Sequence, residues 1–178
     1  MRLPILSLLL ATATTLGAST PLWMRDIRIS PDGSTIAFTY KGDIFTVPAK
    51  GGMATRLTST DAYEAAPVWS PDGSRIAFSS DREGSADVFV MPAKGGEATR
   101  LTSNSANETP EAFTPDGKSV VYTAYIQAPA TSRTFPTSRL TQLYTVAADG
   151  KGRPSRLLST PALNLSWLPD GKSFLYED

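Results

Sequence analysis

The tripeptide Pro-Asp-Gly occurs four times in this chain, each time between two short apolar runs. The copies begin at Pro31, Pro71, Pro115 and Pro169, so that successive copies lie 40, 44 and 54 residues apart. Proline presets φ at the second turn position, aspartate bonds its own backbone further on, and glycine accepts the positive φ that closes a hairpin. The spacing is the period of a four-stranded propeller blade. We therefore predict an array of β-hairpins that repeats blade by blade.

The segments around the tripeptide repeat as well. Residues 34–38 read Ser-Thr-Ile-Ala-Phe and residues 74–78 read Ser-Arg-Ile-Ala-Phe, with the alternation of a pleated strand. A third strand follows a polar turn and ends in proline, which fits the end of a strand, and a short outer strand comes after it. The predicted fold is all-β, a partial β-propeller of three four-stranded blades and a truncated fourth. The blades lie at about residues 24–60, 64–104 and 108–160, and the half blade lies at 163–178.

Propellers close with about four to eight blades, and each blade buries its faces only against neighbouring blades. Three and a half blades do not close a ring. We therefore expect residues 20–178 to be an incomplete propeller, the front part of a longer protein.

The first residues have the pattern of a secretory signal. Arg2 precedes an apolar run at residues 3–11, which passes into small residues up to Ser19. The competing interpretation is a retained membrane span, but the apolar run is shorter than the ~20 residues that a bilayer core requires. We predict a signal peptide at residues 1–19, export to the periplasm or the medium, and no membrane attachment after cleavage.

Composition excludes several classes of function. Lys and Arg number 17 and Asp and Glu number 17, so no net charge attracts nucleic acid. The chain has neither Cys nor His, which excludes thiolate zinc sites and Ser-His-Asp or Cys-His catalysis within it. The repeated aspartates match the requirements of the turn rather than those of a calcium loop. We predict no catalytic residue, no cofactor and no metal site in this segment.

Other repeated positions have structural interpretations. A large apolar residue stands two places before each proline, and we predict that it packs between blades. Arg56 and Arg100 share a position in the outer strands, where we expect solvated charges that protect an edge. Asp81 and Arg82 could form a salt bridge in a turn, but such surface pairs are worth only ~0–1 kcal/mol. The apolar position is filled by Ile29, Trp69, Phe113 and Trp167.

The segment 125–140 is inserted between the second and third strands of the third blade and accounts for the widened spacing there. Long loops on a rigid scaffold are often functional. Tyr125, Arg133, Phe135 and Arg139 supply aromatic and cationic groups for a peptide or its carboxylate, and we predict a peptide-binding site there. The alternative, equally open, is that the insertion packs on a following domain.

Residues 70–82, Ser-Pro-Asp-Gly-Ser-Arg-Ile-Ala-Phe-Ser-Ser-Asp-Arg, and residues 87–91, Asp-Val-Phe-Val-Met, resemble the TolB-like (WD40-like, PD40) propeller repeats. The same repeats occur in the amino-terminal propeller of exported tricorn-type serine peptidases, which this chain resembles because its first blade follows the signal directly. The resemblance implies a non-catalytic propeller segment that filters or binds peptide or protein substrates. The PDZ-like module, the peptidase core and the catalytic Ser and His would lie beyond Asp178 and would be further partners.

Two alternatives stay open at this stage. One is a non-enzymatic periplasmic interaction propeller of the TolB type, which would end after about six blades. The other is a prolyl-oligopeptidase-type enzyme, which would show a Gly-x-Ser-x-Gly nucleophile elbow after the propeller.

Overall fold

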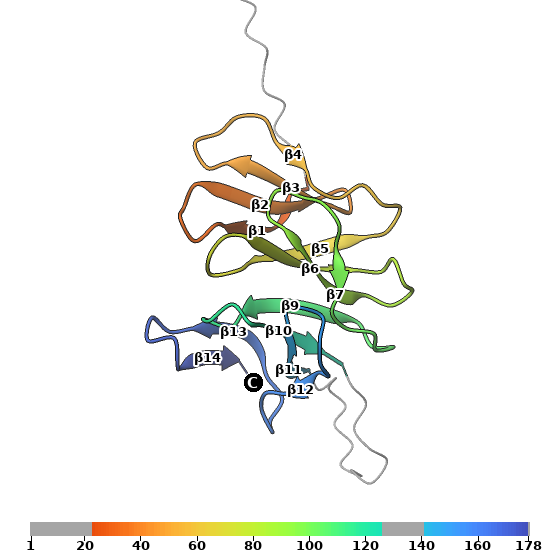
Figure 1. Cartoon of the computed structure of the whole chain (residues 1–178), viewed down its shortest axis with the longest axis vertical. Coiled ribbons are helices and arrows are strands. Elements are labelled where there is room, and N and C mark those ends of the chain that lie inside the picture. The colour runs from red at the N-terminus through yellow and green to blue at the C-terminus, as the bar shows by residue number, and fades with distance from the viewer. Residues whose placement is uncertain (1–22, 126–140, 178) are drawn as a thin grey trace, which may run out of the picture.

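The computed structural model describes residues 23–125 and 141–177, and this part of the chain consists of strands joined by turns and loops. Four antiparallel sheets follow one another along the chain, and each keeps its strands in sequence order. Figure 1 shows the three four-stranded sheets stacked along the long axis of the molecule, with the first sheet at the top and the two-stranded sheet beside the third. The predicted all-β fold, with three four-stranded blades and a two-stranded fourth, is confirmed.

The strand bounds are as follows. Blade one contains β1 (Arg25–Ile29), β2 (Thr35–Tyr40), β3 (Asp43–Pro48) and β4 (Thr55–Arg56). Blade two contains β5 (Glu64–Trp69), β6 (Arg75–Ser80), β7 (Asp87–Pro92) and β8 (Thr99–Arg100). Blade three contains β9 (Glu108–Phe113), β10 (Ser119–Ala124), β11 (Gln142–Ala147) and β12 (Ser155–Arg156). The fourth blade contains β13 (Leu163–Trp167) and β14 (Phe174–Glu177).

The Pro-Asp-Gly turns have the predicted geometry. Their glycines have φ of 72°, 68°, 69° and 63° in chain order. In the second copy, the Gly73 amide donates to the Ser70 carbonyl at 2.9 Å, and Asp72 Oδ1 accepts from Ser70 Oγ at 2.6 Å and from the Ser74 amide at 3.1 Å. The hydroxyl of Ser70 is the main cause that lowers the pKa of Asp72 to about 2. The aspartate carboxylates therefore accept hydrogen bonds within their own turns.

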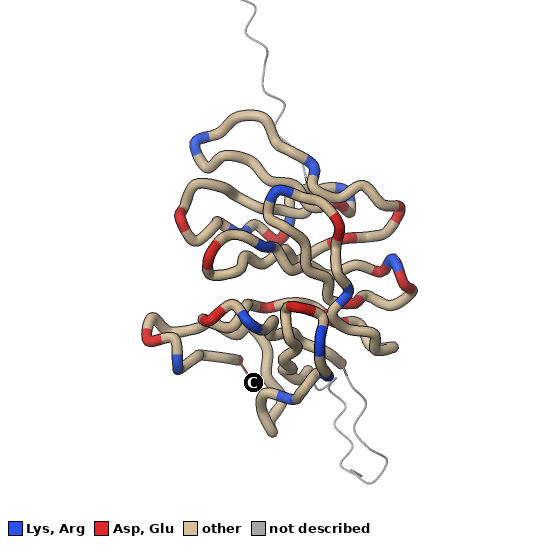
Figure 2. The backbone as a smooth tube through the Cα atoms, in the orientation of Figure 1, with Lys and Arg blue, Asp and Glu red and all other residues tan. Residues whose placement is uncertain are grey.

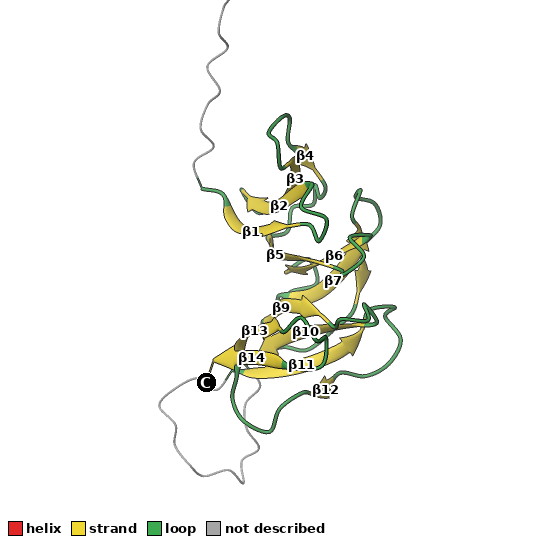
Figure 3. Cartoon of the chain, turned by 90° about the vertical axis from the view of Figure 1, so that its left-hand side faces the viewer, coloured by secondary structure: helices red, strands yellow, loops and turns green. Residues whose placement is uncertain are grey.

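The core lies between the blades rather than within one sheet. At the first interface, between blades one and two, Ile76, Phe78, Phe89 and Met91 of blade two pack against Ala37 and Ile44 of blade one. At the second interface, between blades two and three, Val120, Tyr122 and Val146 pack against Val68, Ala77 and Val90. At the third interface, Val121 and Leu143 pack against Leu165 of the fourth blade and against Ala162, which immediately precedes β13. Figure 3 shows the sheets side by side without closure into a ring.

The large apolar residues before each turn pack between blades in three of the four repeats. Trp69 contacts the core of the first interface, Phe113 is buried in the second, and Trp167 packs in the third. Ile29 is the exception, with 60% of its surface exposed, because no described sheet precedes β1.

The structure corrects two predictions about charged residues. Arg56 and Arg100 are not simply solvated: Arg100 Nη2 donates to Oδ2 of the buried Asp87 at 2.6 Å, and Arg56 Nη2 donates to Asp43 Oδ2 at 2.7 Å. The outer strand is thereby tied to the start of the third strand.

Asp81 and Arg82 do not pair with each other. Arg82 pairs with Glu64, whereas Asp81 Oδ1 accepts the Tyr63 amide at 2.7 Å. A carboxylate buried at the start of β5 attracts the arginine more strongly than an exposed neighbour does.

Charged residues of both signs are distributed over all the blades, as Figure 2 shows. Within residues 23–125 and 141–177 no helix is long and apolar enough to cross a membrane. The predicted signal peptide, residues 1–19, lies outside the described residues and stays a prediction.

Candidate functional site

The four predicted peptide-binding residues are only partly described. Tyr125 follows β10 directly and is 51% exposed. Arg133, Phe135 and Arg139 lie outside the described residues, so the predicted site stays a prediction.

Strand pairing nevertheless places Tyr125 at a defined end of blade three. Ala124, the last residue of β10, pairs with Glu108 on one side and with Gln142 on the other. Tyr125 therefore leaves the blade where β9 and β11 begin.

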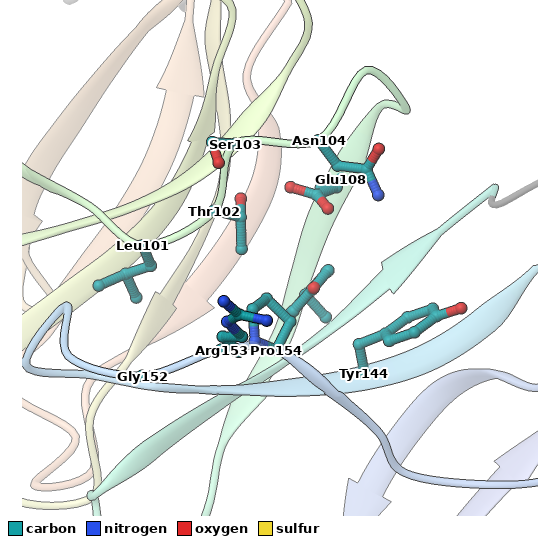
Figure 4. Close-up of a pocket in the computed structure, with 10 residues that line it drawn as sticks. Leu101, Thr102, Ser103, Asn104, Glu108, Tyr144, Gly152, Arg153 and Pro154 are labelled. Carbon is teal, nitrogen blue, oxygen red and sulfur yellow. The ribbon is translucent and has the colours of Figure 1, made fainter.

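A cavity of about 560 Å³ opens near this end of the second interface, and Figure 4 shows the side chains around it. Its wall from the side of blade two is the segment 101–104, which follows β8. Blade three contributes the first residue of β9, one tyrosine each from β10 and β11, and the segment 152–154 before β12. The cavity thus lies between two blades, and neither blade forms it alone.

Glu108 is the chemically distinctive residue of this cavity. It is only 1% exposed, and its Oε2 has no hydrogen-bond partner. Its backbone amide donates to the Ala86 carbonyl at 2.7 Å, which fixes the start of β9 against blade two. Burial raises the pKa of the Glu108 carboxyl to about 7, and the nearby Asp87 carboxylate acts in the same direction.

Two stacked tyrosines form an aromatic surface beside this carboxyl. The ring centroids of Tyr122 and Tyr144 are 5.7 Å apart, with 26° between the ring planes. The Tyr144 hydroxyl donates to Gln142 Oε1 at 2.8 Å. Burial raises the pKa of both phenols, so both rings stay neutral and present electron-rich faces.

The wall on the side of blade two is held by buried hydrogen bonds. Thr102 Oγ1 accepts the Val88 amide at 2.9 Å, and the Thr102 carbonyl accepts Arg100 Nε at 2.8 Å. Arg100 in turn pairs with Asp87, so it is already engaged. These bonds keep the wall in place, and a hydrogen bond from the Thr102 side chain to the Glu108 carboxyl opposes the rise of its pKa.

Arg153 lies on the facing wall together with Tyr144, opposite Glu108 and Asn104 (Figure 4). Arg153 is exposed, and the ion pairs found among the described residues do not include it. A carboxylate beside aromatic rings suits the binding of a cationic group, because both the charge and the ring faces attract a cation.

A second cavity, of about 710 Å³, lies at the turn end of the first interface. Its carboxylates, Asp32 and Asp72, accept hydrogen bonds from the serines of their own turns. The described residues contain no group of three side chains suited to hold a metal ion. The cavity at Glu108 is therefore the stronger candidate for binding.

Sequence reasoning missed Glu108 as a site residue. The signal was available, because Glu64 and Glu108 both stand seven residues before a Pro-Asp-Gly proline, at the first position of an inner strand. An ionisable residue at a position that the repeat buries indicates a candidate binding or ion-pair site.

The model of the tricorn protease N-terminal beta propeller domain family matches residues 21–178. Dipeptidyl-peptidase 5 of Porphyromonas gingivalis is 37% identical over 70 residues, which cover 34% of this chain and 10% of that protein. Tricorn protease homolog 1 of Streptomyces coelicolor is 36% identical over 55 residues, which cover 31% of this chain and 5% of that protein. The match therefore spans a small part of these longer relatives.

Two solved structures show the same fold. A protein assigned as TolB from Agrobacterium tumefaciens superposes with a TM-score of 0.72 at 22% identity, over 88% of this chain and 54% of that one. The crystal structure of the tricorn protease gives a TM-score of 0.53 at 18% identity, over 70% of this chain and 13% of that one. At these identities the likeness shows the fold alone.

Proposed function

The chain belongs to the family of tricorn protease N-terminal β-propeller domains, and we propose that it serves as the non-catalytic propeller segment of an exported, tricorn-like serine peptidase. Its role in that protein is to bind or filter peptide or protein substrates. The observation that carries the proposal is the family match over residues 21–178. The relatives named as peptidases support it, since one is a dipeptidyl-peptidase and the other a tricorn protease homolog.

Catalysis is assigned to sequence outside this chain. The 178 residues contain no His and no Cys, so a serine or cysteine nucleophile here has no imidazole base. The propeller then contributes recognition. The cavity at Glu108 lies at the same end of blade three as Tyr125, the last described residue before the insertion. Export of the protein rests on the signal pattern at residues 2–19.

The test uses the full-length gene product, read beyond Asp178. We expect a PDZ-like stretch and a serine peptidase core there, and peptide hydrolysis by the purified protein. Replacing Arg133→Ala together with Arg139→Ala is expected to raise KM for peptides several-fold. The free energy of unfolding should change by no more than about 0.5 kcal/mol, because the repeat that builds the blades does not require the insertion.

Two results would contradict the proposal. A gene that ends after about six blades, without a peptidase core, would favour a TolB-type interaction propeller. An unchanged KM in the double variant, with easier separation of the propeller from its neighbour under limited proteolysis, would make the insertion a docking element.

A further inference from the structure

The first interface contains a guanidinium in a well-defined position. Arg82 Nη2 donates to Oε1 of the buried Glu64, and Arg82 Nε donates to Ser80 Oγ at 2.9 Å. The guanidinium carbon lies 4.5 Å from the ring centroid of Phe89 and 5.6 Å from that of Phe78. A carboxylate and two stacked rings thus hold one planar cation.

Among residues 23–125 and 141–177, the second interface shows the same frame without a cation paired to its carboxylate. Tyr122 and Tyr144 pair across β10 and β11 as Phe78 and Phe89 pair across β6 and β7. Glu108 stands at the first position of β9 as Glu64 does in β5, and both are buried. Among the described residues no ion pair to Glu108 is found, and the cavity opens there instead.

From this correspondence we propose that the cavity between blades two and three binds the guanidinium of an arginine side chain carried by a peptide. The inference deepens the proposed function and rests on it, because it names the side chain that a bound peptide places against Glu108, Tyr122 and Tyr144. The guanidinium would lie over the tyrosine rings and donate to the Glu108 carboxylate, as Arg82 does in the first interface.

Physical chemistry favours this ligand over other cations. A buried carboxylate is costly when one of its oxygens has no partner, as is the case for Glu108 Oε2, and a cation that enters the cavity reduces that cost. A planar, weakly hydrated guanidinium stacks on aromatic faces and offers several donors, whereas an ammonium group is compact and strongly hydrated. Asn104 lies beside Glu108 and supplies a further polar group at the entrance (Figure 4).

The test measures binding of N-acetyl-arginine amide to the full chain by isothermal titration calorimetry. N-acetyl-citrulline amide, which has the same shape without the charge, should bind at least about tenfold more weakly, since charge-assisted hydrogen bonds and cation–π contacts supply the affinity. Glu108→Gln should weaken arginine binding by a similar factor. Glu111→Gln is the matched control on the same strand, outside the cavity, and should leave binding unchanged.

A gain-of-site variant makes the test sharper. Arg82→Ala removes the cation from the first interface and should create a second binding site, so that the stoichiometry rises from one to two. Glu64→Gln added to Arg82→Ala should return it to one. Folding of each variant is checked by far-UV circular dichroism, which keeps a lost site distinct from a lost fold.

Each of the following outcomes would overturn the inference. If the arginine and citrulline probes bind equally well, charge does not contribute to binding. If Glu108→Gln binds the arginine probe with full affinity, the carboxylate does not contribute. Binding that appears only after Arg133→Ala and Arg139→Ala would show that the chain's own arginine occupies the site. If peptides without arginine bind while the arginine probe does not, the inference fails and the proposed function stands; if no peptide binds, both fail.

Discussion

The first and second interfaces are built from the same repeat, and each is closed at one end by an arginine. The closed end is the glutamate end in the first interface and the Pro-Asp-Gly end in the second. At the first interface Arg82 covers Glu64, and a cavity remains at the Pro-Asp-Gly turns, where Thr35 lines the wall. At the second interface Arg75 closes the turn end: its Nη2 donates to the Gly117 carbonyl at 2.6 Å, and its guanidinium lies 5.3 Å from the ring centroid of Phe113. The cavity of the second interface then lies at the Glu108 end.

This difference separates two kinds of repeated position. The turns and the apolar contacts between blades are shared by both interfaces, because each blade requires them to stack. The arginines differ between copies, and their placement decides where each interface stays open. In this fold, we therefore expect binding sites at the positions where the side chains differ between repeats.

Removing the arginine of the first interface should have the largest effect on stability. Arg82→Ala leaves the Glu64 carboxylate buried without its cation, and breaking such a pair costs about 3 kcal/mol or more. Urea unfolding followed by circular dichroism measures the loss. Glu64→Gln combined with Arg82→Ala should recover part of it, since the double variant buries no unpaired charge; additive losses would show that the two side chains do not interact.

The turns should respond alike at both interfaces. Gly73→Val and Gly117→Val each place a β-branched residue at a φ near 70°, which costs about 1–3 kcal/mol of backbone strain. At Gly73 an added Cβ would lie 3.8 Å from Pro31 Cδ, so strain rather than collision dominates. Asp72→Asn is the control, because asparagine keeps the turn and its side-chain bonding. If Asp72→Asn and Gly73→Val have equal urea midpoints, the glycine has no special requirement in this turn.

The sequence predicted the turns, the strands and the packing between blades because those properties are local and repeat with a fixed period. It did not predict the cavity, because the cavity depends on which side chain reaches Glu108 from elsewhere in the fold. Arg82 is the second residue after β6, whereas in blade three the insertion begins at the corresponding place. Likewise, the pairing of Arg100 with Asp87 joins residues 13 positions apart that only the antiparallel sheet brings together.

Glu108 should make stability depend on pH. Its pKa is about 7 in the folded chain and near 4.5 when exposed, so the folded state holds a proton that the unfolded state has lost. Stability is therefore lost as the pH rises from about 4.5 to 7, by at most about 3 kcal/mol, and we expect about 1–2 kcal/mol because water enters the open cavity.

The measurement compares the urea midpoints of the wild type and Glu108→Gln between pH 4.5 and 8. Several other groups face Glu108, namely Asp87 and Arg100 of blade two and Tyr122, Tyr144 and Arg153 of blade three. They are present in both proteins, so the difference between the two curves isolates Glu108. If the urea midpoints of the two proteins change in parallel with pH, the Glu108 carboxyl is not shielded from water. The second interface would then hold no buried carboxyl to compare with Glu64.

The smallest effect is expected where the two interfaces differ by a single hydrogen bond. Trp69 Nε1 donates to the Arg28 carbonyl of blade one at 3.2 Å, whereas Phe113, in the matching place of the second interface, has no donor. Trp69→Phe should therefore cost less than about 1 kcal/mol, the usual net contribution of a neutral hydrogen bond. Trp167→Phe is the matched control: Trp167 Nε1 is buried without a partner, so losing it should change the urea midpoint little or raise it. A larger loss in Trp167→Phe than in Trp69→Phe would mean that ring size, rather than the bond between blades one and two, governs this position.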